Sequence, residues 1–562
     1  MGLSSLSIRN RIMPLFLAAA VLLPSSLLAQ EKLQIGGGSA PAAAADEPVA
    51  VITLGSIGKL IQDANYITGA AGQPGAGGMF QMAAATFTNG IDSTRPIGMI
   101  VPMVNGMPDP IVVIPTSDIK RVLKTLEAQL GPVDELDDGT LVIAVNANTV
   151  YIRQTADWAF ASRTRDTLNL APGDPTTLFK GMGNNYDLAF RIRMQQIPPE
   201  TRNMIVAQMR QGFEQAMANQ EDEAGREMAE NSIDQMEMVL KESDKIDFGL
   251  NIDSTLQQIL LDFTFTVVPG SKLASIYGEQ QAIPSKFASV IRKDAAAYFH
   301  AATAVSQEAI QTARDRLENT LSTVRTAMAN EADLPAEQQA EINKFIDRIA
   351  NFYVDSLAEG KLDMGAMLLA DQNEFRFAMG GFVADGSEAA QIAKDIAAKI
   401  ENEPGAPTFK FDQGNYNGVT MHVIEKEVPA GEEQVRKVFG DVLRVHIGTG
   451  EKAVYVAAGK DSETLVKNLI DAGTEDPSFA QRPVSQMRVT MLPILKFAQS
   501  MDDNAAIAGM INALSGAVDP GEITMVGQAI PNGSKTRITI GEGLIKAIGA
   551  AAEQARGGGG QF

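Results

Sequence analysis

The 562-residue sequence contains no cysteine, and this absence excludes disulfide bonds, a thiol nucleophile, thiolate metal sites and a lipid-modified N-terminal cysteine. Aromatic residues make up only 6% of the chain and Trp158 is the single tryptophan, so platforms for stacking sugars are few. Apolar residues make up 45% of the chain, which is enough for a sizeable core. Packing and hydrogen bonding must therefore stabilise the fold without covalent cross-links.

Histidine is also scarce, and the three residues of this type are His300, His422 and His446. The last two lie in the alternating segments VTMHVIE and LRVHIG, so neighbouring strands could bring them together. Glu425 or Asp441 could then complete a metal site. No HExxH motif or comparable spacing accompanies them, so we predict no metal and no cofactor.

The common catalytic motifs are missing as well. The sequence has no GxSxG, no GxxxxGK[ST] and no GxGxxG in a strand–helix setting. Ser56 and Lys59 fit SxxK, in which a lysine assists a nucleophilic serine, but the companion SDN and KTG motifs are absent. Because Ser56 follows a strand and precedes a helix, we predict that it is a helix N-cap. The sequence therefore names no catalytic, cofactor-binding or metal-ligating residue.

Negative charge dominates the chain. Sixty-eight acidic residues against 47 basic ones give a formal net charge of −21. Such a surface repels phosphate backbones and anionic head groups. We therefore expect no nucleic-acid partner and no electrostatic docking to a membrane.

The N-terminus has the features of a secretory signal peptide. Two arginines precede an apolar run from Met13 to Leu23, and Ala29 provides a small residue at the cleavage point. We predict that residues 1–29 are removed, that 30–47 form a flexible leader, and that the product is exported to the periplasm or the extracellular space. No other window is apolar over the length of a membrane span, so we expect no integral membrane segment after cleavage.

A pattern of strand, helix, two strands and helix recurs along the chain. In its clearest copy, Lys361–Ile400, the side chains of Phe375, Phe377 and Met379 alternate with small or polar ones before a helix that starts at Asp385. Similar strand pairs followed by helices occur at Ile97–Leu126, Ile246–Tyr277 and Ile523–Ile548. The order predicts an internal repeat.

We predict an α+β fold with two tandem similar domains, 48–285 and 286–556. Each domain is expected to contain a largely antiparallel sheet covered by helices, with a long helical hairpin inserted at about 198–245 and 306–359. The remaining segments are a glycine-rich connector at Gly69–Gly78 and a glycine-rich tail at 557–562.

Methionine is abundant, with 25 residues, and its flexible thioether suits adaptable apolar grooves. Six methionines recur near helical spacing in the first predicted hairpin: Met204, Met209, Met217, Met228, Met236 and Met238. The same spacing is typical of ordinary core packing. The sequence leaves both interpretations open.

Three segments carry a resemblance to known proteins: STRPIG at Ser93–Gly98, YDLAFRI at Tyr186–Ile192 and VVPGSKLA at Val267–Ala274. In these segments the chain resembles a group of exported bacterial proteins of unknown function. The resemblance implies export and a similar layout, and it transfers no substrate and no site residue.

We therefore expect an exported, non-catalytic protein that binds an unknown partner protein or is structural in the cell envelope. One alternative is a carrier that encloses a lipid or hydrophobic peptide in an apolar pocket. A second alternative is a hydrolase whose site the motifs do not reveal.

Overall fold

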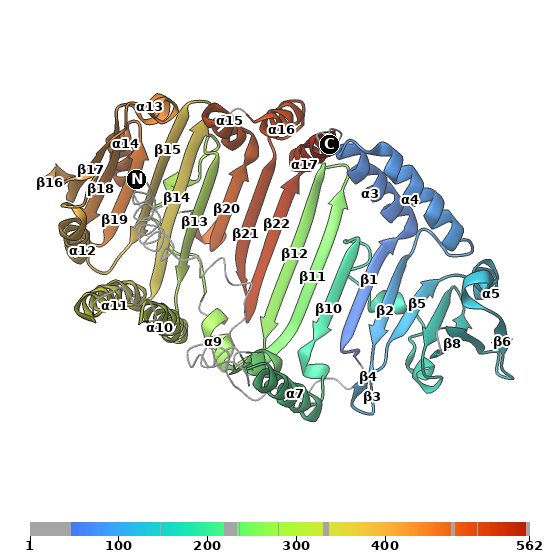
Figure 1. The fold of residues 1–562 in the computed structure, drawn as a ribbon. Coiled ribbons are helices and arrows are strands. Elements are labelled where there is room, and N and C mark those ends of the chain that lie inside the picture. The colour runs from blue at the N-terminus through green and yellow to red at the C-terminus, as the bar shows by residue number, and fades with distance from the viewer. Residues whose placement is uncertain are drawn as a thin grey trace.

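The structure is a computed structural model that describes residues 47–145, 148–217, 233–234, 236–278, 280–329, 336–473, 478–502 and 504–557. The predicted signal peptide, nearly all of the leader and most of the glycine-rich tail lie outside the described residues. Within them the chain is a mixture of helices and antiparallel strands, which confirms the predicted α+β class (Figure 1).

The bounds of the elements are as follows. The strands are β1 (Ala50–Ser56), β2 (Pro96–Val101), β3 (Met103–Val104), β4 (Met107–Pro108), β5 (Ile111–Pro115), β6 (Val133–Glu135), β7 (Leu141–Val145), β8 (Asn148–Thr155), β9 (Trp158–Ser162), β10 (Leu188–Arg193), β11 (Ser243–Asp253), β12 (Gln258–Val267), β13 (Ala297–Ala304), β14 (Lys361–Asp371), β15 (Glu374–Phe382), β16 (Thr408–Tyr416), β17 (Val419–Glu427), β18 (Val442–Gly450), β19 (Ala453–Gly459), β20 (Ser485–Thr490), β21 (Glu522–Ile530) and β22 (Gly533–Gly541). The α-helices are α3 (Ile57–Ala70), α4 (Pro74–Phe87), α5 (Ile119–Thr125), α6 (Glu127–Leu130), α7 (Pro199–Met217), α9 (Lys272–Gly278), α10 (Gln307–Ala329), α11 (Ala336–Ala358), α12 (Gly386–Ile400), α13 (Glu433–Phe439), α14 (Ser462–Asp471), α15 (Met491–Met501), α16 (Ala505–Ser515) and α17 (Glu542–Gly557).

Twenty of the described strands form one continuous antiparallel sheet. Successive pairings give the order β6–β7–β8–β9–β5–β2–β1–β10–β11–β12–β22–β21–β20–β13–β14–β15–β19–β18–β17–β16. The first ten strands of that order all precede residue 268, and the last ten all follow residue 296. Within the sheet, the two parts of the chain therefore meet at a single seam, where β12 pairs with β22.

The order strand, helix, strand, strand, helix occurs four times, and in the stretches that start at β1, β13 and β20 a pair of helices lies between the first two strands. These stretches begin at β1, β10, β13 and β20. Outward from the seam, both parts of the sheet also follow one connection pattern, because β12, β11, β10, β1 and β2 correspond in order to β22, β21, β20, β13 and β14.

The local signals that the sequence carries are found at the expected places. The Asp385 side chain accepts hydrogen bonds from the backbone N–H groups of Ser387 and Glu388 and so caps α12. Asn105 and Gly106 both have positive φ, as a tight turn between β3 and β4 requires. Short-range sequence chemistry therefore determines where these elements begin and turn.

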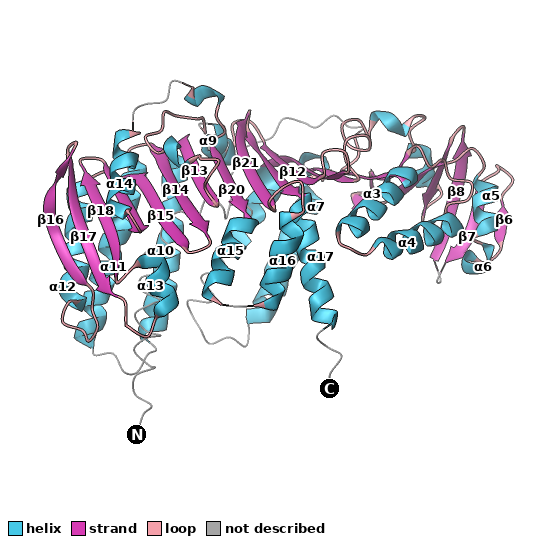
Figure 2. Cartoon of the chain, turned by 90° about the horizontal axis from the view of Figure 1, so that it is seen from above, coloured by secondary structure: helices cyan, strands magenta, loops and turns pink. Residues whose placement is uncertain are grey.

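The two faces of the central strands differ in chemistry. On β12, Leu261, Phe263 and Phe265 point to one face, while Asp262 and Thr264 point to the other. In Figure 2, helices α3, α4, α12, α13, α15, α16 and α17 lie on the same side of the sheet. On the apolar face, Phe375 of β15 contacts Phe439 of α13 and Phe497 of α15, and Phe263 and Phe265 of β12 pack against α9. The apolar face is therefore the face from which the helices project.

Two features of the helices differ from the prediction. The predicted connector Gly69–Gly78 contains the start of α4, which begins at Pro74. Gly77 allows this, since a Cβ atom there would lie 2.3 Å from Oδ1 of Asn65 in α3. In addition, α15 and α16 form a pair of helices between β20 and β21, where the repeated order predicts a single helix. Among the described residues, no helix is both long and apolar enough to cross a membrane.

Candidate functional site

A row of large apolar side chains crosses the middle of the sheet. In register, Leu188 lies opposite Leu250, Leu250 opposite Leu261, and Leu261 opposite Ile538 on the far side of the seam. The row continues through Met525 to Met487. We call these six residues, Leu188, Leu250, Leu261, Ile538, Met525 and Met487, the apolar strip. All of them are only half-buried.

Further apolar side chains extend the strip on both sides. Phe190 and Phe248 stack with ring centroids 5.2 Å apart, and Ile259 faces Ile540 across the seam. All four are half-buried too. Contiguous apolar surface that is left partly open to water can mark an interaction site.

The strip is half-open because the helices pack near the ends of the strands. At one end, α9 covers Phe265, which is buried. At the other end, α15, α16 and α17 pack mainly against each other around Leu495, Leu514 and Ala547. None of the helices that the structure describes packs extensively on β10, β11 or β12. The apolar strip therefore lies between these two helical groups (Figures 1 and 2).

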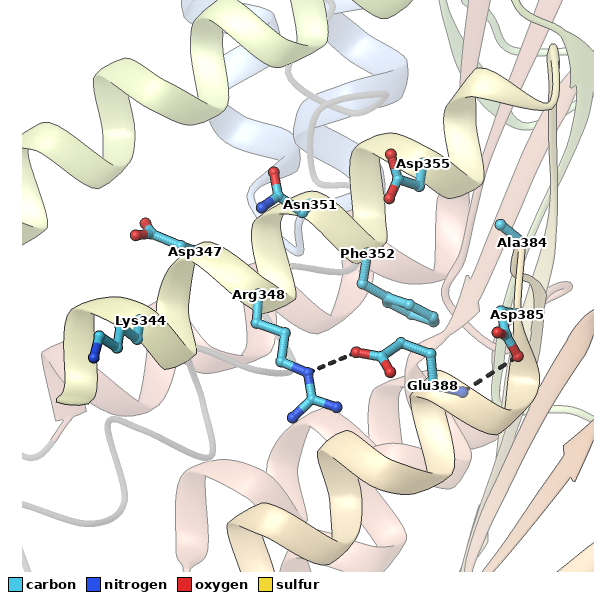
Figure 3. A pocket seen from close by; sticks show the side chains of 9 residues that line it. All are labelled: Lys344, Asp347, Arg348, Asn351, Phe352, Asp355, Ala384, Asp385 and Glu388. Carbon is cyan, nitrogen blue, oxygen red and sulfur yellow. Dashed lines mark hydrogen bonds and ion pairs between the residues drawn. The ribbon is translucent and has the colours of Figure 1, made fainter.

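A pocket of about 560 Å³ lies elsewhere, between α11 and α12 (Figure 3). Its charged side chains mostly hold the two helices together. Arg348 of α11 donates to Glu388 at 2.6 Å and also contacts Asp395, and these hydrogen bonds raise the pKa of the guanidinium. Asp385 is occupied as the α12 cap, and Asp347 pairs with Arg325 of α10. The pocket is an ion-paired helix interface, with no feature that selects a ligand.

The structure separates the two strand histidines that the sequence analysis considered for a metal site. His446 pairs in register with Val423, so His422, the neighbour of Val423, points to the opposite face of the sheet. Nε2 of His422 lies 2.9 Å from the Thr449 hydroxyl, and Nδ1 of His446 lies 2.8 Å from the Ser462 hydroxyl. Burial lowers the pKa of both imidazoles. The two rings cannot share a metal ion.

The remaining candidates for that metal site do not approach a common centre. Glu425 pairs with Lys410 and Arg444, and Asp441 pairs with Arg436. No cluster of three potential ligands occurs in the part of the chain that the structure describes.

The third histidine, His300, belongs to a buried cluster with Ser285 and Asp363 that sequence reasoning missed. The Ser285 hydroxyl donates to Asp363 and accepts from the backbone N–H of Phe287, while Nε2 of His300 lies 2.9 Å from Oγ. Since the single hydroxyl proton is given to Asp363, Nε2 must be the donor to Oγ. The histidine therefore cannot act as a base toward this serine.

Burial also argues against catalysis by this cluster. Ser285, His300 and Asp363 are 2%, 0% and 6% exposed, which leaves no access for a substrate. Burial lowers the pKa of His300 to about 4 and raises the pKa of Asp363. The three residues carry no motif, and Asp363 lies 78 positions from Ser285, so only the fold could reveal the cluster. Their arrangement fits a buried hydrogen-bond network that stabilises the core.

Ser56 is the N-cap of α3, as predicted, and its hydroxyl accepts a hydrogen bond from the Lys59 backbone N–H at 3.3 Å. The Lys59 ammonium lies 2.8 Å from Asp63, contacts Asp187 and donates to the carbonyl of Ile252 at 3.1 Å. An ammonium held by two carboxylates is protonated and cannot activate a serine. SxxK has no catalytic role here.

The methionines of the first predicted hairpin whose side chains the structure describes do not form a common lining. Met204 and Met236 are 42% and 43% exposed, while Met238 packs beside the core around Phe265. Met209 is half-buried, and the side chains of Met217 and Met228 lie outside what the structure describes. The methionines that face the half-open surface are instead Met487 and Met525.

Comparisons with known proteins add little. No family model matches the sequence, and no curated protein matches it either. Among solved structures, one titled "Structure of crystal form IV of TP0453" matches 41% of this chain and 82% of its own length, at 7% identity and a TM-score of 0.21. A similarity this low carries no argument about fold or function.

Proposed function

We propose that the chain is an exported, non-enzymatic binding protein, and that the apolar strip binds the acyl chains of a lipid or a similarly extended hydrocarbon. The observation that carries the proposal is the row of six half-buried apolar side chains between two helical groups. Burying this surface against an aliphatic ligand gains about 25 cal/mol for each Å² removed from water.

The chemistry of the strip favours hydrocarbon over a polar ligand. Its members are leucine, isoleucine and methionine, which offer no hydrogen-bond donors or charges to orient a polar group. The charged residues of the same strands, such as Asp247, Asp262 and Arg537, point to the other face. A ligand on the strip would therefore be selected by apolar contact area and shape.

The pairing of β12 supplies a test residue and a matched control for a binding experiment. Leu261 and Leu260 are adjacent, half-buried residues of β12 that point to opposite faces. Titration of the purified chain with a fluorescent fatty-acid analogue should show saturable binding. Leu261→Asn should weaken binding about tenfold or more, since an unpaired amide would enter the apolar site, whereas Leu260→Asn should bind as the wild type does.

Mass spectrometry of the native protein from its own host should reveal co-purified lipid. Absence of probe binding to the wild type, or equal loss in both leucine variants, would sink the proposal.

Two further proposals complete this function. We infer that the two parts of the sheet are a tandem repeat, which is supported by their common strand order outward from the β12–β22 seam. We also infer export, supported by the charged and apolar pattern of residues 1–29. N-terminal sequencing of protein from the host should give a mature chain that begins near Gln30. An intact Met1 would contradict export by this route.

A further inference from the structure

Helix α4 exposes an unusual amount of apolar surface. Met79, Phe80, Met82 and Phe87 are 68%, 46%, 68% and 50% exposed. Gly77 is the only residue of the helix that is buried. The helix contacts α3 along one side, and its remaining surface faces outward.

The same region carries no charge. Between Asp63 and Asp92 there is no acidic or basic residue, although charged residues make up 20% of the chain. Exposed helices of soluble proteins normally have a charged or polar outer face. α4 has none, and Gln81 and Thr86 are its only polar side chains.

The distribution of the apolar side chains around α4 distinguishes among possible occupants. At 100° per residue, Met82 and Phe80 lie about 160° apart around the axis, with Met79 between them. A helix that packs on another protein normally uses an apolar stripe of about 100°, whereas a helix in the interfacial region of a bilayer buries a whole face among head groups and acyl chains. A broad, uncharged apolar surface therefore fits lipid better than a second protein.

The charge of the protein indicates which kind of lipid head group α4 would contact. With a net charge of −21 and no cationic residue between Asp63 and Asp92, the chain would be repelled by anionic head groups. Zwitterionic head groups impose no such penalty. Contact with them would be driven by apolar burial and would depend little on salt.

We propose that α4 is a membrane-docking helix that inserts its methionine and phenylalanine side chains into the interfacial region of a zwitterionic bilayer. This role is independent of ligand binding on the apolar strip. The helix is 14 residues long, so it lies in the interface and does not span the bilayer.

Vesicle flotation with the full chain and phosphatidylcholine vesicles tests the docking. The wild type should float with the vesicles at both low and high salt. The double variant Phe80→Ser, Phe87→Ser should lose about tenfold or more of its vesicle partition coefficient. A control variant, Leu256→Ser, removes a side chain that is 66% exposed in the β11–β12 turn and should float as the wild type does.

A fluorescence measurement locates the contact. Trp158 is the only tryptophan and is 5% exposed, so its emission should not respond to vesicles. In Phe80→Trp the added indole should shift to shorter wavelength with phosphatidylcholine vesicles and be quenched by brominated lipid.

Three results would overturn the proposal. They are wild-type protein that does not float, a double variant that floats unchanged, and a blue shift of the Phe80→Trp emission that rises with protein concentration in the absence of lipid. The last result would assign α4 to contact with a second copy of the chain. Loss of docking in the double variant with intact binding of the fatty-acid analogue would separate this role from that of the strip.

Discussion

Asp262 of β12 and Arg537 of β22 lie directly opposite each other across the seam and are joined by two hydrogen bonds of 2.7 and 2.6 Å. The carboxylate is buried and also accepts a hydrogen bond from the Tyr186 hydroxyl at 2.7 Å. Burial raises the pKa of Asp262, but Arg537 and Tyr186 outweigh this effect and hold it below its usual value. This ion pair thus links the N-terminal and C-terminal parts of the sheet.

Loss of this link should destabilise the chain. Arg537→Gln leaves the buried Asp262 carboxylate without its main partner, so the free energy of unfolding should fall by about 1 to 3 kcal/mol, as measured by urea denaturation at pH 7. The loss should shrink as the pH falls through the lowered pKa of Asp262, because a protonated carboxyl no longer needs the cation. The control is Arg436→Gln, which breaks an exposed pair with Asp441 and should cost less than about 1 kcal/mol. Equal losses would contradict a special role for the seam.

A pH effect should arise at the base of α3. Burial raises the pKa of Asp63 to about 6, although Lys59 opposes the shift. A raised folded-state pKa means that the folded chain binds the proton more tightly than the unfolded chain, so the stabilisation is complete below about pH 4 and is lost as the pH rises through 6. The stability difference between wild type and Asp63→Asn should therefore change by about 1 to 3 kcal/mol between pH 4 and 7. Asp134→Asn alters an exposed carboxyl on β6 and should show no comparable change.

The Ser285 cluster should behave as a structural element. Ser285→Ala removes the hydroxyl that donates to buried Asp363, so we expect a loss of about 1 to 3 kcal/mol in chemical denaturation, against little change for the exposed Ser117→Ala. A fluorophosphonate probe should not label Ser285 in the native chain. Labelling of Ser285 would support the alternative that the protein is a hydrolase.

Much of the fold could be predicted because its signals are local. The alternation of Leu261, Phe263 and Phe265 with Asp262 and Thr264 defines a strand with one apolar face, and cap residues such as Asp118 locate helix starts. Neither signal says which strands pair. The joining of both parts into one sheet depends on β12 meeting β22, which lie more than 250 residues apart.

The candidate site was harder to predict for the same reason. The sequence shows that Leu250 and Leu261 belong to an apolar face, but a covered face and a half-open one have the same alternation. The separation of His422 from His446 depended on a register offset of one residue, which no pattern within either strand specifies.

The clearest misreading, the segment Gly69–Gly78, leads to a prediction within one helix. Propensity treats Gly77 and Gly78 alike, since both weaken a helix by about 1 kcal/mol relative to alanine. Their surroundings differ. A Cβ atom on Gly77 would lie 2.3 Å from Asn65 Oδ1 and 2.7 Å from Thr68 Oγ1, whereas a Cβ atom on Gly78 meets nothing within 4 Å.

Gly78→Ala should therefore stabilise the chain by up to about 1 kcal/mol, whereas Gly77→Ala should destabilise it by about 1 to 3 kcal/mol because α4 must move away from α3. Thermal and urea unfolding of the two variants would measure the difference. Hydrogen exchange should localise the loss in Gly77→Ala to α3 and α4. If Gly77→Ala were as stable as Gly78→Ala, the close contact between these two helices, and with it the position of the docking surface on α4, would be wrong.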